Sequence, residues 1–306
     1  MDTPREELAV PVTQQWTIGR LLQWSKEYLQ SKRVESPRLS VELLLAHALH
    51  CKKIDLYLRI ERVPTEEERG EFRELLLRAA EHAPIAHLIG KKEFYSIEFE
   101  VSPAVLIPRP ETELLVEKVI QHVRALPQLH VAVLDLGTGS GCVGLALCRH
   151  LPQVRVTGTD VSEEALAVAR SNAERLGLNE RFVAVGVDGF DFPPESIPTG
   201  GWDMLVSNPP YVAENETSGL DENVRRYEPS AALFGGMDGL KFYRLMADRA
   251  ETVLKPRASV WVEIGAGQHE SVVKLMTESG RYKHVETFKD LNEGHSRVVR
   301  FDRIER

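Results

Sequence analysis

The sequence predicts an α/β protein with a doubly wound sheet, mostly parallel with an antiparallel last strand, preceded by an α-helical bundle and a hairpin linker. Two patterns support this prediction. Up to about residue 85, apolar residues recur mainly at helical spacing. From residue 131 onward, short apolar runs alternate with helical patterns, and this alternation is typical of a parallel sheet with right-handed crossovers.

The composition is that of a soluble globular protein. The 306 residues are 42% hydrophobic and 27% charged, and no apolar run approaches the roughly 20 residues needed to span a bilayer. The acidic start is unlike a signal peptide, and Cys51, Cys142 and Cys148 lack paired spacing, as expected for thiols in a reducing compartment. The formal net charge of −8 weighs against a nucleic-acid substrate. We therefore expect a cytoplasmic protein that binds no membrane and contacts no nucleic acid directly.

Residues 1–85 are predicted to form a helical domain. Apolar spacing predicts a helix over 18–29, and a second helix follows the Ser36-Pro37 cap through residue 48. A capping box at 65–68 opens a third helix that runs through residue 79. His82 and His87 have no third ligand nearby, so we interpret them as surface or packing residues and expect no metal site.

Residues 86–112 are predicted to link this domain to a second one, residues 113–306. Period-two alternation over 94–101 predicts a strand or hairpin. The prolines at 108 and 110 then stiffen the chain. Glu111 and Glu113 favour the start of a helix that runs through Val123.

The second domain carries the strand–helix alternation. Its predicted strands are 131–136, 154–159, 182–187, 202–207 and 259–264. Helices are predicted after residue 141, over about 162–176, over 240–254 and from about 268. A last antiparallel hairpin is expected to pair 284–288 with 297–301. Ligands of such sheets bind outside the carboxyl ends of the strands, so the unusual residues at those ends define the candidate site.

A glycine-rich loop, Gly137-Thr138-Gly139-Ser140-Gly141, follows the first strand. Glycines permit positive φ and let a ligand approach the backbone closely. The G-x-G-x-G spacing resembles an S-adenosylmethionine loop more than a dinucleotide loop. A tight strand-to-helix turn without a ligand is the simpler alternative.

An aspartate follows each of the next two strands. Asp160 comes about 20 residues after the loop, where a carboxylate accepts hydrogen bonds from ribose hydroxyls; otherwise it caps the helix before Ser162. Asp188 could accept a hydrogen bond from an adenine amino group, or be an ordinary loop carboxylate.

The fourth strand ends in Asn208-Pro209-Pro210-Tyr211. Proline lacks an N–H, so two prolines end the strand abruptly in a stiff, extended segment. The segment presents an amide, bare carbonyls and an aromatic face, which suits binding a planar group that carries an NH2. A Pro-Pro turn with a capping asparagine is the alternative.

Together these strand ends resemble those of class I S-adenosylmethionine-dependent methyltransferases, and the Asn-Pro-Pro-Tyr form is similar to members that methylate exocyclic or amide nitrogen. The resemblance implies S-adenosyl-L-methionine as cofactor and S-adenosyl-L-homocysteine as product. We expect the Asn208 oxygen and the Pro209 carbonyl to accept the two N–H hydrogens of the target, which orients its nitrogen. Tyr211 would pack on the flat face of the target group. No strong general base is evident in the motif.

Three further stretches carry a more specific resemblance: Ile-Pro-Arg-Pro-Glu-Thr-Glu at 107–113, Tyr-Glu-Pro-Ser-Ala-Ala-Leu at 227–233 and Gly-Gly-Met-Asp-Gly-Leu at 235–240. With them, the chain closely resembles the HemK/PrmC family over nearly its whole length. The resemblance implies methylation of the glutamine side-chain amide in the Gly-Gly-Gln motif of class 1 peptide chain release factors, which the helical domain would dock. It also implies that residues 137–141, Asp160, Asp188 and Asn208 hold the cofactor.

One departure from the family affects the adenine contact. The family often has an aromatic residue directly after the aspartate, whereas this chain has Gly189 followed by Phe190. Either the stacking contact is absent here, or Phe190 provides it. Other readings also stay open: a glutamine of a large-subunit ribosomal protein as the target, an adenine or guanine amino group of a nucleic acid, or a binding module without activity.

Overall fold

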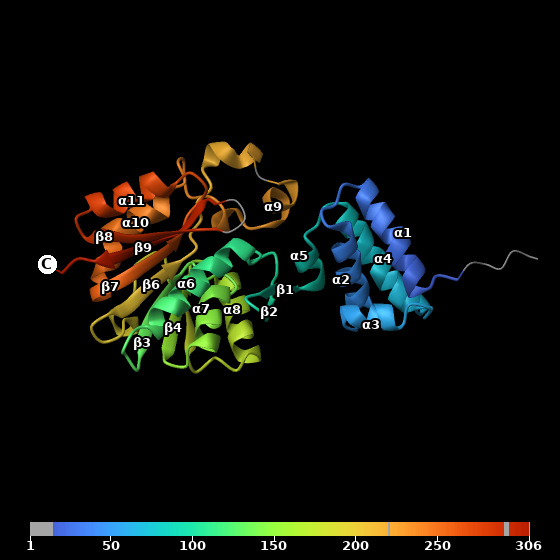
Figure 1. Cartoon of the computed structure of the whole chain (residues 1–306), viewed down its shortest axis with the longest axis horizontal. Coiled ribbons are helices and arrows are strands. Elements are labelled where there is room, and N and C mark those ends of the chain that lie inside the picture. Colours follow the sequence, from blue (N-terminus) through green and yellow to red (C-terminus); the bar gives the residue numbers. More distant parts are fainter. Residues whose placement is uncertain (1–14, 220, 291–293, 306) are drawn as a thin grey trace, which may run out of the picture. The chain divides into compact units, whose positions relative to one another are not determined.

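The computed structural model describes residues 15–219, 221–290 and 294–305, and the chain divides into two compact units, 1–89 and 90–306. None of the helices in these described ranges combines the length and hydropathy needed to cross a membrane. Figure 1 follows the chain through both units, each of which is described by itself below.

The first unit is helical, as predicted. Its helices are α1 (Ile18–Ser31), α2 (Pro37–Ala48), α3 (Lys53–Leu58), α4 (Glu66–Ala80) and α5 (Ile85–Ile89). The capping box is present at the start of α4, where Thr65 Oγ1 accepts from the Glu68 N–H and Glu68 accepts from the Thr65 N–H. Leu29, Leu44 and Phe72 are fully buried and contribute to its core. The sequence does not predict α3 and α5, because each helix is too short to show a repeated helical period.

The second unit begins with a hairpin, β1 (Lys91–Phe94) and β2 (Ile97–Glu100), which pair antiparallel. Its turn residues Tyr95 and Ser96 have φ of 50° and 58°, so a two-residue turn of the type that matches strand twist closes the hairpin. The sequence predicts a strand or hairpin over 94–101, whereas the hairpin of the structure starts three residues earlier, at Lys91. A 3-10 turn, η1 (Pro110–Thr112), then leads into α6 (Glu113–Arg124).

The main sheet has seven strands in the order β5-β4-β3-β6-β7-β9-β8. The strands are β3 (Val131–Leu136), β4 (Val154–Asp160), β5 (Phe182–Gly186), β6 (Trp202–Ser207), β7 (Leu254–Glu263), β8 (Tyr282–Lys289) and β9 (Ser296–Arg303). Neighbours from β5 to β7 pair parallel, whereas β9 pairs antiparallel with both β7 and β8. The predicted doubly wound sheet and terminal hairpin are therefore confirmed.

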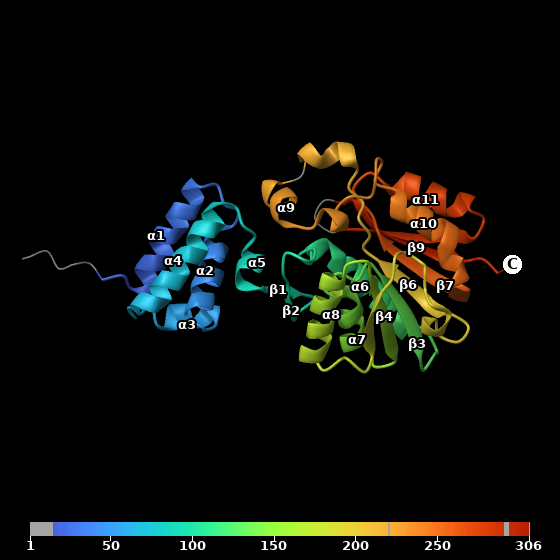
Figure 2. The ribbon, with the colours of Figure 1, turned by 180° about the vertical axis from the view of Figure 1, so that it is seen from behind.

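Helices cover both faces of this sheet (Figures 1 and 2). One core joins the sheet to α6, α7 (Cys142–His150) and α8 (Glu163–Arg175). The other joins it to α10 (Lys241–Arg249) and α11 (His269–Glu278). Val133 belongs to the first core and Leu134 to the second, so the strand is apolar on both faces. Burial on both faces explains why the sequences of these strands are nearly continuous apolar runs.

The helix predicted over 240–254 is shorter than expected. The structure ends α10 at Arg249, continues through a 3-10 turn, η5 (Ala250–Thr252), and begins β7 at Leu254. Pro256 and Arg257, whose φ is 63°, lie within that strand and obscure its start in the sequence. The remaining short elements are η2 (Pro194–Ser196), η3 (Glu214–Gly219), α9 (Glu222–Tyr227) and η4 (Ser230–Ala232).

Candidate active site

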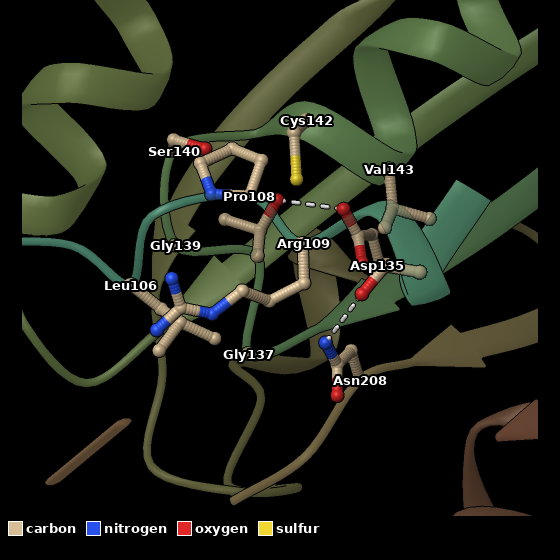
Figure 3. Close-up of a pocket in the computed structure, with 12 residues that line it drawn as sticks. Leu106, Pro108, Arg109, Asp135, Gly137, Gly139, Ser140, Cys142, Val143 and Asn208 are labelled. Carbon is tan, nitrogen blue, oxygen red and sulfur yellow. Dashed lines mark hydrogen bonds between the residues drawn. The ribbon is translucent and has the colours of Figure 1, made fainter. Parts of the chain in front are cut away.

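A pocket lies where the carboxyl ends of β3 and β6 meet, at the point where the strand order reverses. Figure 3 shows the residues that surround it. They come from the segment before α6, the end of β3, the glycine-rich loop, the start of α7 and the residue after β6: Leu106, Pro108, Arg109, Thr112, Asp135, Gly137, Thr138, Gly139, Ser140, Cys142, Val143 and Asn208. The structure thus brings most of the predicted loop and Asn208 to one pocket.

The glycine-rich loop needs its glycines for two different reasons. Gly137, Gly139 and Gly141 have φ of 71°, 54° and 80°, a backbone conformation that side chains rarely adopt. A Cβ added at Gly137 or Gly139 would meet nothing within 4 Å, so the backbone there is open to a ligand. At Gly141 the added Cβ would lie 2.9 Å from Leu145, so this glycine also allows α7 to pack closely.

Two aspartates hold the loop in place. Asp135 is fully buried at the end of β3 and accepts from the Thr138 hydroxyl at 2.7 Å and from the Gly144 N–H at 3.0 Å. Burial raises the pKa of Asp135 to about 6, against the effect of these two donors. Asp160, at the end of β4, accepts from the Gly139 N–H at 3.0 Å through one oxygen.

The other oxygen of Asp160 accepts from the Ser162 N–H at 3.0 Å, and Ser162 caps α8. Asp160 therefore links the loop to the start of this helix. Carboxylate oxygens can accept more than one hydrogen bond, so the predicted ribose contact is compatible with this arrangement and stays a prediction.

The predicted adenine-side residues lie away from the residues that line the pocket. Asp188 is exposed, two positions after β5. Gly189 has φ of 58°, and a Cβ there would lie 2.8 Å from Leu245, so a side chain would strain this turn. The Phe190 ring is buried in the core beneath α10, near Trp202 and Met246. The structure thus gives Phe190 a packing role, and its stacking on adenine stays a prediction.

The chain turns out of β6 at Asn208. Just before it, the Ser207 hydroxyl donates to the Leu136 carbonyl at 2.7 Å, which ties the end of β6 to the end of β3. The Asn208 Nδ2 donates to Thr112 Oγ1 at 2.9 Å, and within the described residues Asn208 Oδ1 accepts no hydrogen bond. Pro209 is buried, which keeps this exit from the sheet rigid.

The rest of the segment packs against a glycine-rich stretch. Gln268 Nε2 donates to the Tyr211 carbonyl at 2.9 Å, and burial raises the pKa of the Tyr211 phenol to about 12, so the phenol stays protonated. A Cβ added at Gly235 would lie 2.5 Å from the Pro210 carbonyl oxygen, and one at Gly239 would lie 2.3 Å from the Tyr211 oxygen. Only glycine, which has no Cβ, lets the two backbone segments lie this close together. Pro210 and Tyr211 are not among the residues that line the pocket.

A buried carboxylate holds the segment before α6 over the pocket. Glu228 is 6% exposed, and it accepts from Arg109 at 2.5 Å and from the Ile107 N–H at 3.1 Å. The sequence predicts no individual role for Glu228, Thr112 or Asp135. The first two lie within the specific stretches at 227–233 and 107–113, which was the available signal. Nothing in the sequence indicated their contacts, because those contacts join distant parts of the chain.

Residue types that bind metals are scattered in this unit. Among the described residues, no group of three or more His, Cys, Asp or Glu side chains is arranged to hold a metal ion. Cys142 and Cys148 are free thiols whose pKa burial raises to about 12, so both stay protonated. Besides backbone groups, hydroxyls and the Asn208 amide, the lining of the pocket includes the side chains of Arg109 and Asp135.

The sheet order and the glycine-rich loop define the class of this protein. Residues 110–224 match the methyltransferase small domain. The catalytic domain of hMettl16, 18% identical over 66% of this chain and 74% of that chain, superposes with a TM-score of 0.50, which supports the fold alone. The protein is an S-adenosylmethionine-dependent methyltransferase.

Comparisons over nearly the whole chain define its family. Residues 20–90 match the PrmC N-terminal domain. The release factor glutamine methyltransferase of Rhodopirellula baltica is 39% identical over 93% of this chain and 95% of its own length. That of Geobacter sulfurreducens is 40% identical over 87% of this chain and 90% of its own length. The chain belongs to the PrmC family of release factor glutamine methyltransferases.

Proposed function

We propose that this protein transfers a methyl group from S-adenosyl-L-methionine to the side-chain amide nitrogen of the glutamine in the Gly-Gly-Gln motif of class 1 peptide chain release factors. The names of its relatives support this substrate. The single structural observation that carries the proposal is the Asn208 amide. Its NH2 is held by Thr112, so its oxygen is left to accept from a second amide in the same pocket.

An amide nitrogen is a weak nucleophile because its lone pair is delocalised into the carbonyl. Asn208 Oδ1 and the Pro209 carbonyl would accept the two N–H hydrogens of the glutamine, which holds its nitrogen in one orientation. Both acceptors carry partial negative charge, so they also favour the positive charge that grows on nitrogen as the new N–C bond forms. The nitrogen then loses one proton and the product is the N-methyl amide.

Among the described residues that line the pocket, we assign no strong base to this nitrogen. Asp135 is fully buried and accepts from the Thr138 hydroxyl, and Glu263 is fully buried at the end of β7. We therefore assign most of the rate to positioning and to stabilisation of charge, and the proton leaves to water. Tyr211, whose phenol stays protonated, would pack against the flat face of the glutamine amide.

The cofactor would lie along the glycine-rich loop. The open backbone at Gly137 and Gly139, with no room taken by side chains, fits a ligand that approaches the main chain. Residues 137–141, Asp160, Asp188 and Asn208 would hold it, with Asp160 nearest the ribose and Asp188 nearest the adenine. The bound cofactor supplies a methyl group on a positively charged sulfur and leaves as S-adenosyl-L-homocysteine. The helical unit would dock the release factor, in the cytoplasm where translation takes place.

The proposal is tested by methyl transfer from labelled S-adenosylmethionine to an intact release factor, beside a release factor whose Gly-Gly-Gln glutamine is changed to alanine. We expect label on the first and none on the second. Purified large-subunit ribosomal protein and duplex DNA serve as competing acceptors. Labelling of the ribosomal protein or the DNA, but not of the release factor, would overturn the proposed substrate.

A further inference from the structure

One glutamine side chain holds the far end of the Asn-Pro-Pro-Tyr segment that leaves β6. Gln268 directly precedes α11, and its Nε2 donates to the Tyr211 carbonyl at 2.9 Å. Its Oε1 accepts from the Gly265 N–H at 2.9 Å. The side chain therefore connects the turn between β7 and α11 to the last residue of the segment.

Both partners of the Gln268 amide are backbone groups, and this fixes which way the amide points. A backbone N–H only donates a hydrogen bond, and a carbonyl oxygen only accepts one. An amide flipped by half a turn would set its NH2 against the Gly265 N–H and its oxygen against the Tyr211 carbonyl. One orientation alone satisfies both contacts. The Gln268 N–H also donates to the Gly265 carbonyl at 3.1 Å, which joins these two residues a second time.

Two buried glycines make room for this contact. A Cβ added at Gly265 would lie 2.8 Å from Gln268 Oε1 and 3.0 Å from Cδ2 of the Tyr211 ring. A Cβ added at Gly239 would lie 2.6 Å from Gln268 Nε2. The Gln268 amide thus packs directly against the backbone of two separate turns, and the Tyr211 ring packs against one of them. Larger side chains at either glycine would displace the amide.

The segment from Asn208 to Tyr211 depends on contacts at its two ends. The two prolines between these residues have no N–H, so they cannot donate to a neighbouring strand, and their φ is fixed at about −65°. At the near end, the Ser207 hydroxyl donates to a carbonyl at the end of β3 at 2.7 Å. At the far end, Gln268 holds the Tyr211 carbonyl. With both ends held and stiff prolines between them, the Pro209 carbonyl has little freedom to turn.

We propose that Gln268 is a positioning residue for methyl transfer, which holds the Pro209 carbonyl and the Tyr211 ring in the orientation that the substrate amide requires. This inference rests on the proposed function, in which the Pro209 carbonyl accepts one N–H of the target and Tyr211 packs on its flat face. Gln268 is not among the described residues that line the pocket, so it acts through Tyr211 rather than on the reacting atoms.

Gln268→Glu removes the donor and keeps the shape of the side chain. The carboxylate can still accept from the Gly265 N–H, but its other oxygen faces the Tyr211 carbonyl, and two acceptors repel each other. We expect kcat for release-factor methylation to fall about tenfold or more, while the Kd for S-adenosylmethionine from calorimetry changes less than about threefold. The matched control is Gln121→Glu, the same change at an exposed position of α6, which should alter neither value.

Gly265→Ala provides a second route if Gln268→Glu does not fold, which urea unfolding establishes. The φ of Gly265 lies outside the left-handed region, so the backbone is not what opposes alanine there, but the added Cβ would push the Gln268 amide and the Tyr211 ring away. We expect a similar loss of kcat. The double variant should lose little more than either single variant, because both changes break the same contact. Additive losses would overturn the proposal, since they would indicate two unrelated roles.

The Tyr211 ring gives a readout that needs no substrate. In protein labelled with fluorotyrosine, its fluorine NMR signal is assigned by its absence in Tyr211→Phe. We expect Gln268→Glu to shift or broaden this signal and to leave that of Tyr95, in the turn between β1 and β2, unchanged. Failure of the wild type to methylate any release factor would contradict the proposed function, whereas the ring signal would still test whether Gln268 holds Tyr211.

Three results would overturn the inference. The first is a normal kcat in folded Gln268→Glu. The second is a lost kcat with an unmoved Tyr211 signal, since Gln268 would then not act through Tyr211. The third is a loss of affinity for S-adenosylmethionine as large as the loss of kcat, since it would indicate a general structural role for Gln268 rather than a role in orienting the methyl acceptor.

Discussion

Asn208 belongs to a motif that the sequence identifies, but it also makes a contact that the sequence does not predict. The two prolines after it predict a stiff departure from β6, and Asn208 does lie at the end of that strand beside the glycine-rich loop. The orientation of its amide depends on Thr112, which lies 96 residues earlier in the chain. No local pattern encodes such a contact, because it arises only when η1 is packed over the end of β6.

Replacing Asn208 by alanine separates catalysis from cofactor binding. We expect Asn208→Ala to abolish methyl transfer, a loss of at least about a hundredfold in kcat, because one of two acceptors for the target N–H groups is gone. Affinity for S-adenosylmethionine should stay within roughly tenfold, about 1.4 kcal/mol, since the loop backbone is untouched. Kinetics and calorimetry on the same preparation check both parts.

The matched control is Asn179→Ala, which removes an exposed asparagine that follows α8. It should leave both kcat and affinity unchanged. Normal turnover in Asn208→Ala would show that the Asn208 amide does not bind and orient the target nitrogen.

At the scale of elements, α8 carries an asparagine that joins the hairpin to the cofactor loop. Asn172 is fully buried, its Oδ1 accepts from the Glu100 N–H at 2.8 Å, and its Nδ2 donates to the Glu100 carbonyl at 3.0 Å. The same NH2 donates to the Ser140 carbonyl at 3.0 Å. One side chain thus pairs with the backbone of β2 as a neighbouring strand would, and also fixes the loop.

We expect Asn172→Ala to destabilise the protein by about 2–4 kcal/mol, because it leaves the part-buried N–H and carbonyl of Glu100 and the buried carbonyl of Ser140 without this partner. It should also weaken S-adenosylmethionine binding, because Ser140 lies in the loop. Urea unfolding and calorimetry measure the two effects. The neighbouring Ser171→Ala removes an exposed hydrogen bond to the Glu100 side chain and should cost less than about 0.5 kcal/mol.

An equal loss of stability in both variants would contradict this assignment, since it would indicate a general sensitivity of α8 rather than the buried contacts of Asn172. Unchanged cofactor affinity in Asn172→Ala would separate the hairpin contact from the loop contact. The prediction for the loop would then be wrong.

The sequence predicted elements well where one periodicity dominated. β3 and β6 span the predicted residues because both are apolar on each face and end at Gly or Asn-Pro. The hairpin start was misplaced because β1 is largely charged, with only Phe94 buried. Its turn, Tyr95-Ser96, lacks the glycine or asparagine that usually reports positive φ. Instead, Glu113 of α6 stabilises it by accepting from the Tyr95 N–H at 2.8 Å.

At the scale of the whole molecule, two buried carboxyl groups make stability depend on pH. Burial raises the pKa of Glu263 from 4.5 to about 7 and that of Asp135 from 3.8 to about 6. The folded state therefore binds these protons more tightly than the unfolded chain does. The stability that the two protonated carboxyl groups contribute is fully present below their pKa in the unfolded chain. It is lost as the pH rises through their pKa in the folded protein.

We expect Glu263→Gln to flatten this dependence between about pH 4.5 and 7, because the amide does not ionise. As the pH rises from about 4.5 to 7, the free energy of unfolding of the variant should increase relative to that of the wild type by on the order of 3 kcal/mol, as the shift in pKa requires. Denaturant unfolding of both proteins across this range measures the difference. Both proteins contain Asp135, so its effect on stability cancels when the two curves are subtracted. Parallel stability curves would show that Glu263 titrates near its ordinary pKa.

The helical unit, residues 1–89, supplies the last prediction. The pocket is built entirely from residues of the second unit, 90–306, so the chemistry does not require the first. We expect deletion of the helical unit to leave the S-adenosylmethionine Kd within about tenfold and to spare methylation of a short peptide that contains Gly-Gly-Gln. Methylation of the intact release factor should lose kcat/KM through KM, because docking contacts outside the motif are gone. Calorimetry first establishes that the remaining unit is folded, and the peptide reaction shows that it is active. If the truncated protein then methylates intact release factor with the kcat/KM of the full chain, the helical unit does not dock the substrate.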